Sequence, residues 1–308
     1  MSVRSAGAGL RPVAALAGAT MALVLVPASS PSTTLAGAAG PQVVPAVDFD
    51  AAGFVGGAIT GVAVAGDYAY VSRGLRLEVF DVSDPASPRL VGGSGLLPGM
   101  AKATVSRHGV VYLVERVRGA AVDELDRLIV VDASVPSAPE LRGSLEMPKG
   151  TLADIAVGAG FLYTAAEGLG VMVLDISDPE RPHVVGAVAF DERVNGVAVA
   201  DAGLLVAVGG THDGGLRVLS LDDPMRPQPM GSLEVANGGG RTVAGVGDFA
   251  LLATRDRVVV VDVGDPTAPR AQAQVPRVYN ARAIAVEGRR AFVLGAPAAV
   301  RDTHHLTA

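Results

Sequence analysis

Residues 61–92 read GVAVAGDYAYVSRGLRLEVFDVSDPASPRLVG, and this stretch determines how the rest of the chain is interpreted. Its first half alternates apolar residues on both sides of a turn at Gly66-Asp67, which is the period-two pattern of paired strands. Its second half runs through further apolar residues into a turn at Ser83-Asp84-Pro85, and a short strand follows at residues 89–92. The stretch therefore predicts one four-stranded antiparallel unit.

The turn of this unit recurs along the chain at starting points 42 to 51 residues apart. Asp or Ser followed by Pro suits a type I turn, because Pro presets φ at the second position and the Asp side chain caps the backbone. A repeat of this length with four strands is the period of a propeller blade. The five copies are DVSDPASP at Asp81, DASVPSAP at Asp132, DISDPERP at Asp175, SLDDPMRP at Ser220 and DVGDPTAP at Asp262.

The strand pair that precedes the turn recurs six times, so the chain predicts an all-β, six-bladed β-propeller of four-stranded antiparallel blades. The sixth pair has no turn motif after it. We expect the N-terminal segment Gln42–Phe49 to close the ring as the outer strand of the sixth blade, with Ala298–Asp302 as its third strand, since closure removes an exposed sheet edge. The six pairs are Gly61–Val71, Ala103–Leu113, Asp154–Thr164, Gly196–Val206, Thr242–Leu252 and Ala283–Val293.

The repeated units resemble the LVIVD-repeat family of secreted bacterial β-propellers. The resemblance is carried by RLEVFDVSDPASPRLVG, VMVLDISDPERPHVVG and VVVVDVGDPTAP and covers roughly Ala58–Leu294. The second unit departs most, because DASVPSAP replaces the usual turn and an insertion precedes it. The resemblance implies the fold and export from the cell. It implies no shared chemistry, so function has to be argued from the site.

The N-terminal residues have the composition of a secretory leader. Arg4 and Arg11 precede the apolar run Val13–Val26, and small residues follow. The run is shorter than the roughly 20 residues that a membrane span needs. We therefore predict a signal peptide at residues 1–28, with cleavage there or as late as residue 38, a flexible linker at 29–40, and the propeller at 41–308. The mature protein is expected to be secreted, extracellular or periplasmic, without membrane insertion.

The composition narrows the classes of partner. The chain has 308 residues, no Cys, no Trp and a formal net charge of −6, and it contains 25 Lys and Arg together. The absence of Cys excludes disulfides and thiolate metal sites. An acidic protein is a poor nucleic-acid binder, so no nucleic acid is expected as a partner.

Propellers bind ligands around the mouth of the central channel, where two sets of loops gather: those from strand four to the next strand one, and those from strand two to strand three. One repeat position lies just ahead of each inner strand at this mouth, and three of its six residues are basic. Converging cations would favour an anionic small molecule, glycan or protein partner. The alternative is that these side chains only bond carbonyl groups of the neighbouring blade. The position holds Thr60, Lys102, Ala153, Asn195, Arg241 and Arg282, and Asp154 follows Ala153.

The loops from strand two to strand three add further candidates. Arg73 and Glu167 lie in the loops of the first and third units. The second unit carries the long loop Glu115–Asp126, which is either a functional graft on a rigid fold or a tolerated insertion. Within it, Asp123, Glu124 and Asp126 lack the regular spacing of a calcium loop and could bind Ca²⁺ only weakly. No cofactor or metal motif is present otherwise.

Three residues could supply acid–base chemistry at the mouth. His212 is the one His that the repeat alignment brings there, and it precedes Asp213 in a glycine-flanked loop; Tyr279 lies in the last connecting loop. No spacing in the sequence requires a catalytic arrangement. We therefore predict a binding or interaction module with a basic-rimmed mouth. The alternatives are an extracellular lyase or hydrolase acting on an anionic substrate, with these residues as candidates, and a purely structural cell-surface protein.

Overall fold

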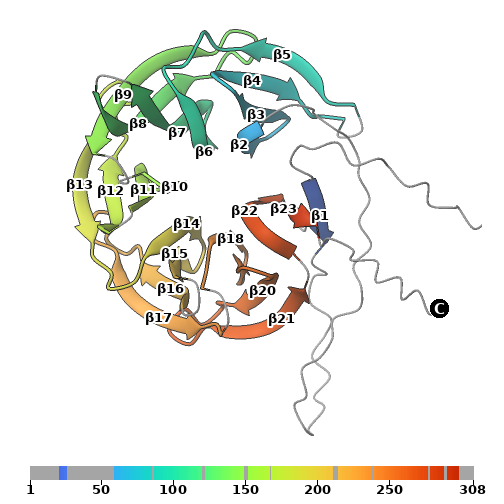
Figure 1. The fold of residues 1–308 in the computed structure, drawn as a ribbon, viewed down its shortest axis with the longest axis vertical. Coiled ribbons are helices and arrows are strands. Elements are labelled where there is room, and N and C mark those ends of the chain that lie inside the picture. The colour runs from blue at the N-terminus through green and yellow to red at the C-terminus, as the bar shows by residue number, and fades with distance from the viewer. Residues whose placement is uncertain are drawn as a thin grey trace, which may run out of the picture.

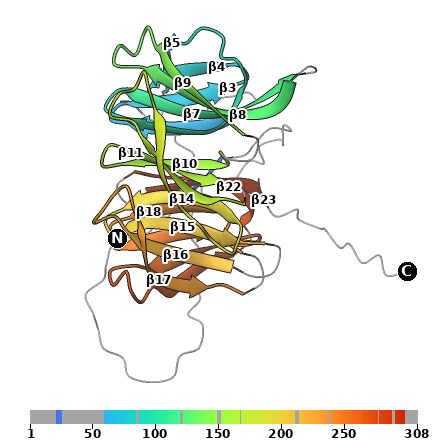
Figure 2. The same cartoon turned by 90° about the vertical axis from the view of Figure 1, so that its left-hand side faces the viewer.

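The computed structural model describes residues 21–25, 59–84, 87–119, 122–148, 152–166, 168–210, 214–236, 239–276, 278–287 and 290–297. All regular elements in these ranges are β-strands, and they form five four-stranded sheets and one three-stranded sheet. Figures 1 and 2 show the sheets arranged around a ring, and each four-stranded sheet has its first strand toward the centre. The part of the chain that the structure describes contains no helix long and apolar enough to cross a membrane.

Each four-stranded sheet is a blade whose strands follow one another in chain order, all antiparallel. The strand bounds are, in blade one, β2 (Ile59–Ala65), β3 (Tyr68–Arg73), β4 (Arg76–Asp81) and β5 (Arg89–Gly93); in blade two, β6 (Met100–Arg107), β7 (Val110–Gly119), β8 (Val122–Asp132) and β9 (Glu140–Pro148); in blade three, β10 (Asp154–Gly158), β11 (Phe161–Ala166), β12 (Gly170–Asp175) and β13 (His183–Val188); in blade four, β14 (Val194–Ala200), β15 (Gly203–Gly209), β16 (Gly214–Ser220) and β17 (Gln228–Glu234); in blade five, β18 (Thr242–Val246), β19 (Phe249–Ala253), β20 (Arg257–Asp262) and β21 (Arg270–Pro276).

The expectation of six four-stranded blades is wrong, because the described residues form five. The sixth strand pair is present as β22 (Val278–Glu287) and β23 (Arg290–Pro297), and its third strand is β1 (Met21–Leu25) instead of Ala298–Asp302. The physical reason lies in the sequence: the sixth repeat lacks the Pro-containing turn that joins strand three to strand four in every complete blade. β1 belongs to the segment predicted as a leader. The predicted closing strand, Gln42–Phe49, and residues 298–302 lie outside the described residues.

The turn motif folds as the sequence predicts. In all five copies the residue before the Pro position accepts a hydrogen bond from the backbone N–H three residues later, as in Arg181 to Asp178 at 3.0 Å. The leading Asp caps the chain at its own i+2 residue: Asp81 Oδ1 accepts from Ser83 N at 3.0 Å, and Asp175 Oδ1 accepts from Ser177 N at 2.8 Å. Hydrogen bonds from the Ser83 hydroxyl and from Arg89, together with the Ser83 N–H, lower the pKa of Asp81 to about 2.

Neighbouring blades interlock on the outer side of the ring through glycines that we call socket glycines: Gly92, Gly143, Gly186 and Gly231. Each lies in strand four of its blade, one residue after a β-bulge, and faces the turn of the next blade. A Cβ at these positions would lie far inside contact distance of a backbone carbonyl oxygen. The distances would be 2.2 Å from Gly92 to Pro136 O, 2.5 Å from Gly143 to Pro179 O, 2.7 Å from Gly186 to Met225 O and 2.3 Å from Gly231 to Pro266 O.

Blade five departs from this pattern in a way that fits its position. Ala273 of β21 pairs with Val260 in the register that the socket glycines occupy elsewhere. The sheet that follows blade five has no Asp-Pro turn to be received, since its sequence lacks the motif. A methyl group is therefore compatible with this position. Blade five is thus the last unit in which the turn motif occurs, and its outer strand receives no turn from a following blade.

The hydrophobic core lies between blades. One buried cluster joins Val114 and Leu128 of blade two to Ile155 and Leu162 of blade three, and equivalent clusters join the other neighbours. Because each sheet is covered on both faces, its middle strands are apolar in successive residues, as in the run Val258–Val261. Tyr163 belongs to this packing: it is fully buried, and its hydroxyl donates to Pro224 O of the next blade at 3.0 Å.

Candidate functional site

The repeat position predicted to line the mouth is a special position of the backbone. Thr60, Lys102 and Asn195 each fall where the register between strands one and two shifts, so each is the extra residue of a β-bulge. In blades three and five the equivalent residues, Ala153 and Arg241, lie directly before the inner strand and donate their N–H to strand two. Bulges redirect side chains and are common next to binding sites. The predicted alignment of these positions is therefore matched by the backbone.

Asp154 connects blades three and four. Its Oδ1 accepts from the Ile155 N–H at 2.9 Å, and its Oδ2 accepts from the Val197 N–H of β14 at 3.1 Å. The residue as a whole keeps some exposure, but the desolvation of the carboxylate outweighs the two hydrogen bonds and raises the pKa of Asp154 to about 6. The predicted ligand residue thus has a structural role in joining two blades.

Asn195 connects blades four and five. Its side-chain amide donates to Gly209 O at 2.6 Å and to Gly240 O at 2.7 Å, so it matches the alternative that such side chains bond neighbouring carbonyl groups. The network continues through the backbone, because Gly209 N donates to Arg193 O at 2.8 Å. Arg241 follows Gly240 directly and donates its own N–H to Ala253 O at 2.8 Å. We call the five residues Arg193, Asn195, Gly209, Gly240 and Arg241 the Asn195 rim.

The Asn195 rim presents positive charge to solvent. Arg193 and Arg241 are both exposed, and Arg241 has no side-chain partner among the residues that the structure describes. Arg255, in the hairpin between β19 and β20, is exposed on the same side of blade five. The nearby acidic residues Glu192 and Asp256 already pair with Arg217 and Arg257, respectively. Of the three cations predicted at the ring position, Arg241 is the one whose side chain the structure describes, and it is exposed.

The remaining predicted residues fall into two groups. Arg73 is engaged in blade one, where its guanidinium lies 3.2 Å from Glu78 Oε2. Lys102 lies in β6 and Tyr279 and Arg282 lie in β22, but their side chains are not described. Glu167, His212 and Asp213 lie outside the described residues, so their predicted roles stay predictions.

The segment Glu115–Asp126 is a hairpin, which corrects the prediction of a long loop. Strands β7 and β8 stay paired as far as Gly119 and Val122, and Figure 2 shows the hairpin extending from the ring. The polar composition of the insertion did not predict paired strands. Its polar residues at the base of the hairpin are nevertheless buried on one face, between the blades. Asp126 is fully buried and accepts the Leu152 N–H of the next connection at 3.1 Å.

The weak Ca²⁺ site predicted in this segment gains no support from Asp126, whose carboxylate already accepts a backbone hydrogen bond. Asp123 and Glu124 lie in β8, and their side chains are not described. Among the described residues no group of three or more His, Asp or Glu side chains is placed to hold a metal ion.

Glu115 is a buried carboxylate that the sequence did not single out. It is 1% exposed, and its Oε2 accepts the Gly99 N–H of the connection between blades one and two at 2.7 Å. Arg127, directly opposite in the hairpin, places its guanidinium 3.5 Å from Oε1 and 2.5 Å from Glu146. Burial raises the pKa of Glu115, while the Gly99 N–H and Arg127 act against that rise.

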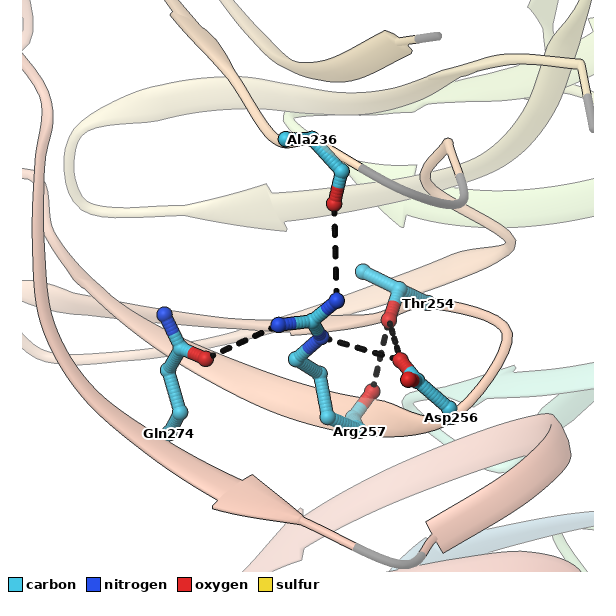
Figure 3. Close-up of polar contacts among 5 residues, drawn as sticks. All are labelled: Ala236, Thr254, Asp256, Arg257 and Gln274. Carbon is cyan, nitrogen blue, oxygen red and sulfur yellow. Dashed lines mark hydrogen bonds and ion pairs between the residues drawn. The ribbon is translucent and has the colours of Figure 1, made fainter. Parts of the chain in front are cut away.

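Arginines on strand three hydrogen-bond to the loops at the mouth, and the sequence analysis did not identify them. Arg76, Arg127 and Arg257 all lie five residues before the leading Asp of the turn motif, a spacing that could have revealed them. Arg76 donates to Ser94 O at 3.0 Å. Figure 3 shows Arg257 donating to Asp256, to Gln274 of β21 at 3.2 Å and to Ala236 O of the preceding connection at 3.5 Å.

The radial arrangement of four-stranded antiparallel sheets defines the protein as a β-propeller. The LVIVD repeat model matches the chain at residues 56–93, 122–146, 149–189 and 237–275, which confirms the family that the sequence resembles. The chain therefore contains LVIVD repeats in these four regions. No curated protein matches the chain in sequence.

Solved structures share the fold at low sequence identity. The chain is similar to the periplasmic gluconolactonase PpgL of Pseudomonas aeruginosa, with a TM-score of 0.58 and 12% identity over 76% of this chain and 77% of that one. It is also similar to the computationally designed protein Ika8, with a TM-score of 0.54 and 14% identity over 77% and 68%. The PQQ-bound aldose sugar dehydrogenase of Streptomyces coelicolor gives a TM-score of 0.50 and 14% identity over 80% and 96%. At these identities the similarity establishes the fold alone.

Proposed function

We propose that the protein is an exported binding module whose channel mouth takes an anionic ligand. The observation that carries this proposal is Arg241: it is exposed at the mouth, its backbone is fixed to Ala253, and its guanidinium has no partner among the described residues. A long cationic side chain on a rigid backbone is suited to pair with an incoming carboxylate or phosphate.

The residues around Arg241 also favour an anionic ligand. The Asn195 rim holds Arg193 and Arg241 on one connected set of hydrogen bonds, so their backbone positions are fixed relative to each other before any ligand arrives. Such preorganisation reduces the entropic cost of binding. Two carboxylates on the same loops, Glu192 and Asp256, pair with Arg217 and Arg257, respectively. An anion that reaches this rim meets the exposed Arg241 side chain in a protein that is acidic as a whole.

The test is a calorimetric and thermal-shift titration with citrate, inorganic phosphate and trigalacturonate. An anion held at 100 times its dissociation constant should stabilise the protein by about 2.7 kcal/mol. Arg241→Ala should lower the affinity at least about ten-fold, the loss of one charge-assisted contact. Arg226→Ala is the matched control, because Arg226 is exposed in the turn before β17, away from the mouth loops. Equal losses in both variants, or no binding of any of the three anions, would refute the proposal.

Export is the second part of the proposal. It is supported by the charged start, the apolar run and the small residues that follow within residues 1–38. Cleavage after residue 28 or 38 would remove β1, and β23 would lose its outer partner. Mass spectrometry of protein recovered from the periplasm or medium tests this directly. A chain that keeps residues 21–25 after recovery would contradict cleavage and would assign β1 to the functional protein.

A further inference from the structure

The mouth loops of blades one to three present apolar side chains to solvent. Leu75 is 43% exposed, Leu96 71%, Met100 49% and Leu169 51%. Leu75 and Leu169 occupy the same repeat position, directly after a glycine in the hairpin between strands two and three. Leu96 lies in the connection from β5 to β6, and Met100 is the first residue of β6. A single exposed leucine needs no explanation, but four on loops of one face indicate a contact surface. We call these four residues the apolar rim.

The exposure of Leu96 and Met100 is a fixed feature of their loop. Leu97, between them, is buried, and its N–H donates to Leu75 O at 2.8 Å. The Gly99 N–H donates to the carboxylate of Glu115, which is itself 1% exposed. Burying a carboxylate is unfavourable unless hydrogen bonds and an opposite charge compensate for it. Here the buried group holds a loop whose neighbouring side chains point into solvent, so the presentation of these side chains is built into the fold.

The two rims lie on different parts of the same ring. Figure 1 shows blades one and two in its upper half and blades four and five in its lower half, with blade three between them. The apolar rim belongs to blades one to three. The exposed arginines Arg193, Arg241 and Arg255 belong to the loops of blades four and five. Among the side chains that the structure describes at the mouth, the exposed apolar ones thus lie mainly on blades one to three and the exposed arginines on blades four and five.

We propose that the ligand of this mouth is a protein segment that carries acidic residues next to large apolar ones; this inference rests on the proposed function and specifies its partner. Acidic side chains complement the arginines of blades four and five, and apolar side chains remove the apolar rim from water. A glycan or a small hydrophilic anion satisfies the first requirement and leaves the second unmet. A protein segment meets both, because it combines the two kinds of side chain along one chain.

The test compares two pools of fluorescein-labelled octapeptides by fluorescence anisotropy. Both pools begin with three Asp or Glu residues; the remaining positions are Leu, Met, Phe and Val in the apolar pool, and Ser, Thr, Asn and Gly in the polar pool. The full chain should bind the apolar pool at least about ten-fold more tightly, which corresponds to the burial of roughly one large apolar side chain. Leu96→Ser/Met100→Ser should remove this difference and leave binding of the polar pool unchanged.

The matched control is Leu90→Ser/Leu141→Ser, in which two apolar residues that are each 56% exposed are replaced on the outer strands β5 and β9. It should keep the preference for the apolar pool. Arg241→Ala should weaken both pools, which reports on the anionic site separately. Equal affinity for the two pools, or loss of the preference in the control, overturns the inference while the anionic site stands. If the protein binds citrate or trigalacturonate but neither peptide pool, the inference is likewise overturned and the anionic site stands. If it binds no anion and neither pool, both proposals are refuted.

Discussion

Replacing Gly92 with Ala should destabilise the protein, whereas the same change at the next residue should not. A Cβ on Gly92 would lie 2.2 Å from Pro136 O and 2.8 Å from two backbone atoms of Ser137. These neighbours are backbone in the tight turn of the next blade, so they cannot move aside as a side chain would. Gly93 offers the matched control in the same strand, because its Cβ would meet only Leu77 O at 3.6 Å, an ordinary contact.

The magnitude follows from two opposing terms. Overpacking a close-packed contact costs about 1–3 kcal/mol, and replacing Gly by Ala recovers about 0.4–1 kcal/mol from the unfolded state where the backbone tolerates Ala. Gly92→Ala should therefore lower the free energy of unfolding by about 1–2 kcal/mol. Gly93→Ala should leave it unchanged or raise it slightly. Neither glycine has a positive φ, so backbone strain adds nothing to the comparison.

The assay is urea unfolding of both variants and the parent protein, followed by far-ultraviolet circular dichroism, with the slopes compared to confirm that similar surface is exposed. If Gly92→Ala is as stable as Gly93→Ala, the socket is not the reason for glycine at this position. The explanation of Gly143, Gly186 and Gly231 would then fail with it, because they share the same geometry.

Three further predictions concern side-chain hydrogen bonds at the mouth and in the turns. Asn195→Ala removes the hydrogen bonds to Gly209 O and Gly240 O and should cost about 1–3 kcal/mol in urea unfolding; an unchanged midpoint would contradict the role of this residue in joining two blades. The pKa of Asp154 is raised to about 6, so the native state holds this proton more tightly than the unfolded chain. Stability should therefore fall as pH rises from about 4 to about 6, by on the order of 1–3 kcal/mol, and Asp154→Asn should flatten this dependence. The pKa of Asp81 is lowered to about 2, so its stabilising contribution is present above about pH 4 and is lost as pH falls toward 2. Asp81→Ala should be less stable than the parent protein above about pH 4, and in acid unfolding this difference in free energy should shrink as pH falls toward 2. A difference that stays constant would argue against the charge of Asp81 as its cause.

Sequence periodicity was sufficient for the blades because their causes are local. The alternation around Gly66-Asp67 pairs two strands, and the Asp-Pro motif forms a turn from bonds within a few residues, as at Asp178 and Arg181. The absence of that motif after residue 293 likewise signalled that the last repeat differs. The prediction of a sixth complete blade failed, because completing it needs a strand supplied from elsewhere in the chain, and periodicity carries no information about which segment that is.

The candidate site was predictable only as a set of positions. Alignment of the repeats identified the mouth position that holds Asn195 and Arg241, but it could not separate a side chain that joins blades from one left open to solvent. That difference depends on carbonyl groups such as Gly240 O, which lies 45 residues from Asn195 in the chain. The same reason applies to Glu115, whose partner Gly99 belongs to the connection from the preceding blade.

The sequence by itself thus determined the repeat, its turns, its family and the positions that gather at the mouth. These features depend on hydrogen bonds and steric limits over a few residues, which residue type largely sets. The tertiary structure decided the number of complete blades, the hairpin form of residues 115–126, and which of the described side chains at the mouth are exposed. Each of these depends on which surfaces of one blade meet the next. Contacts between blades are made by groups about 40 residues apart, and only the folded ring brings them together.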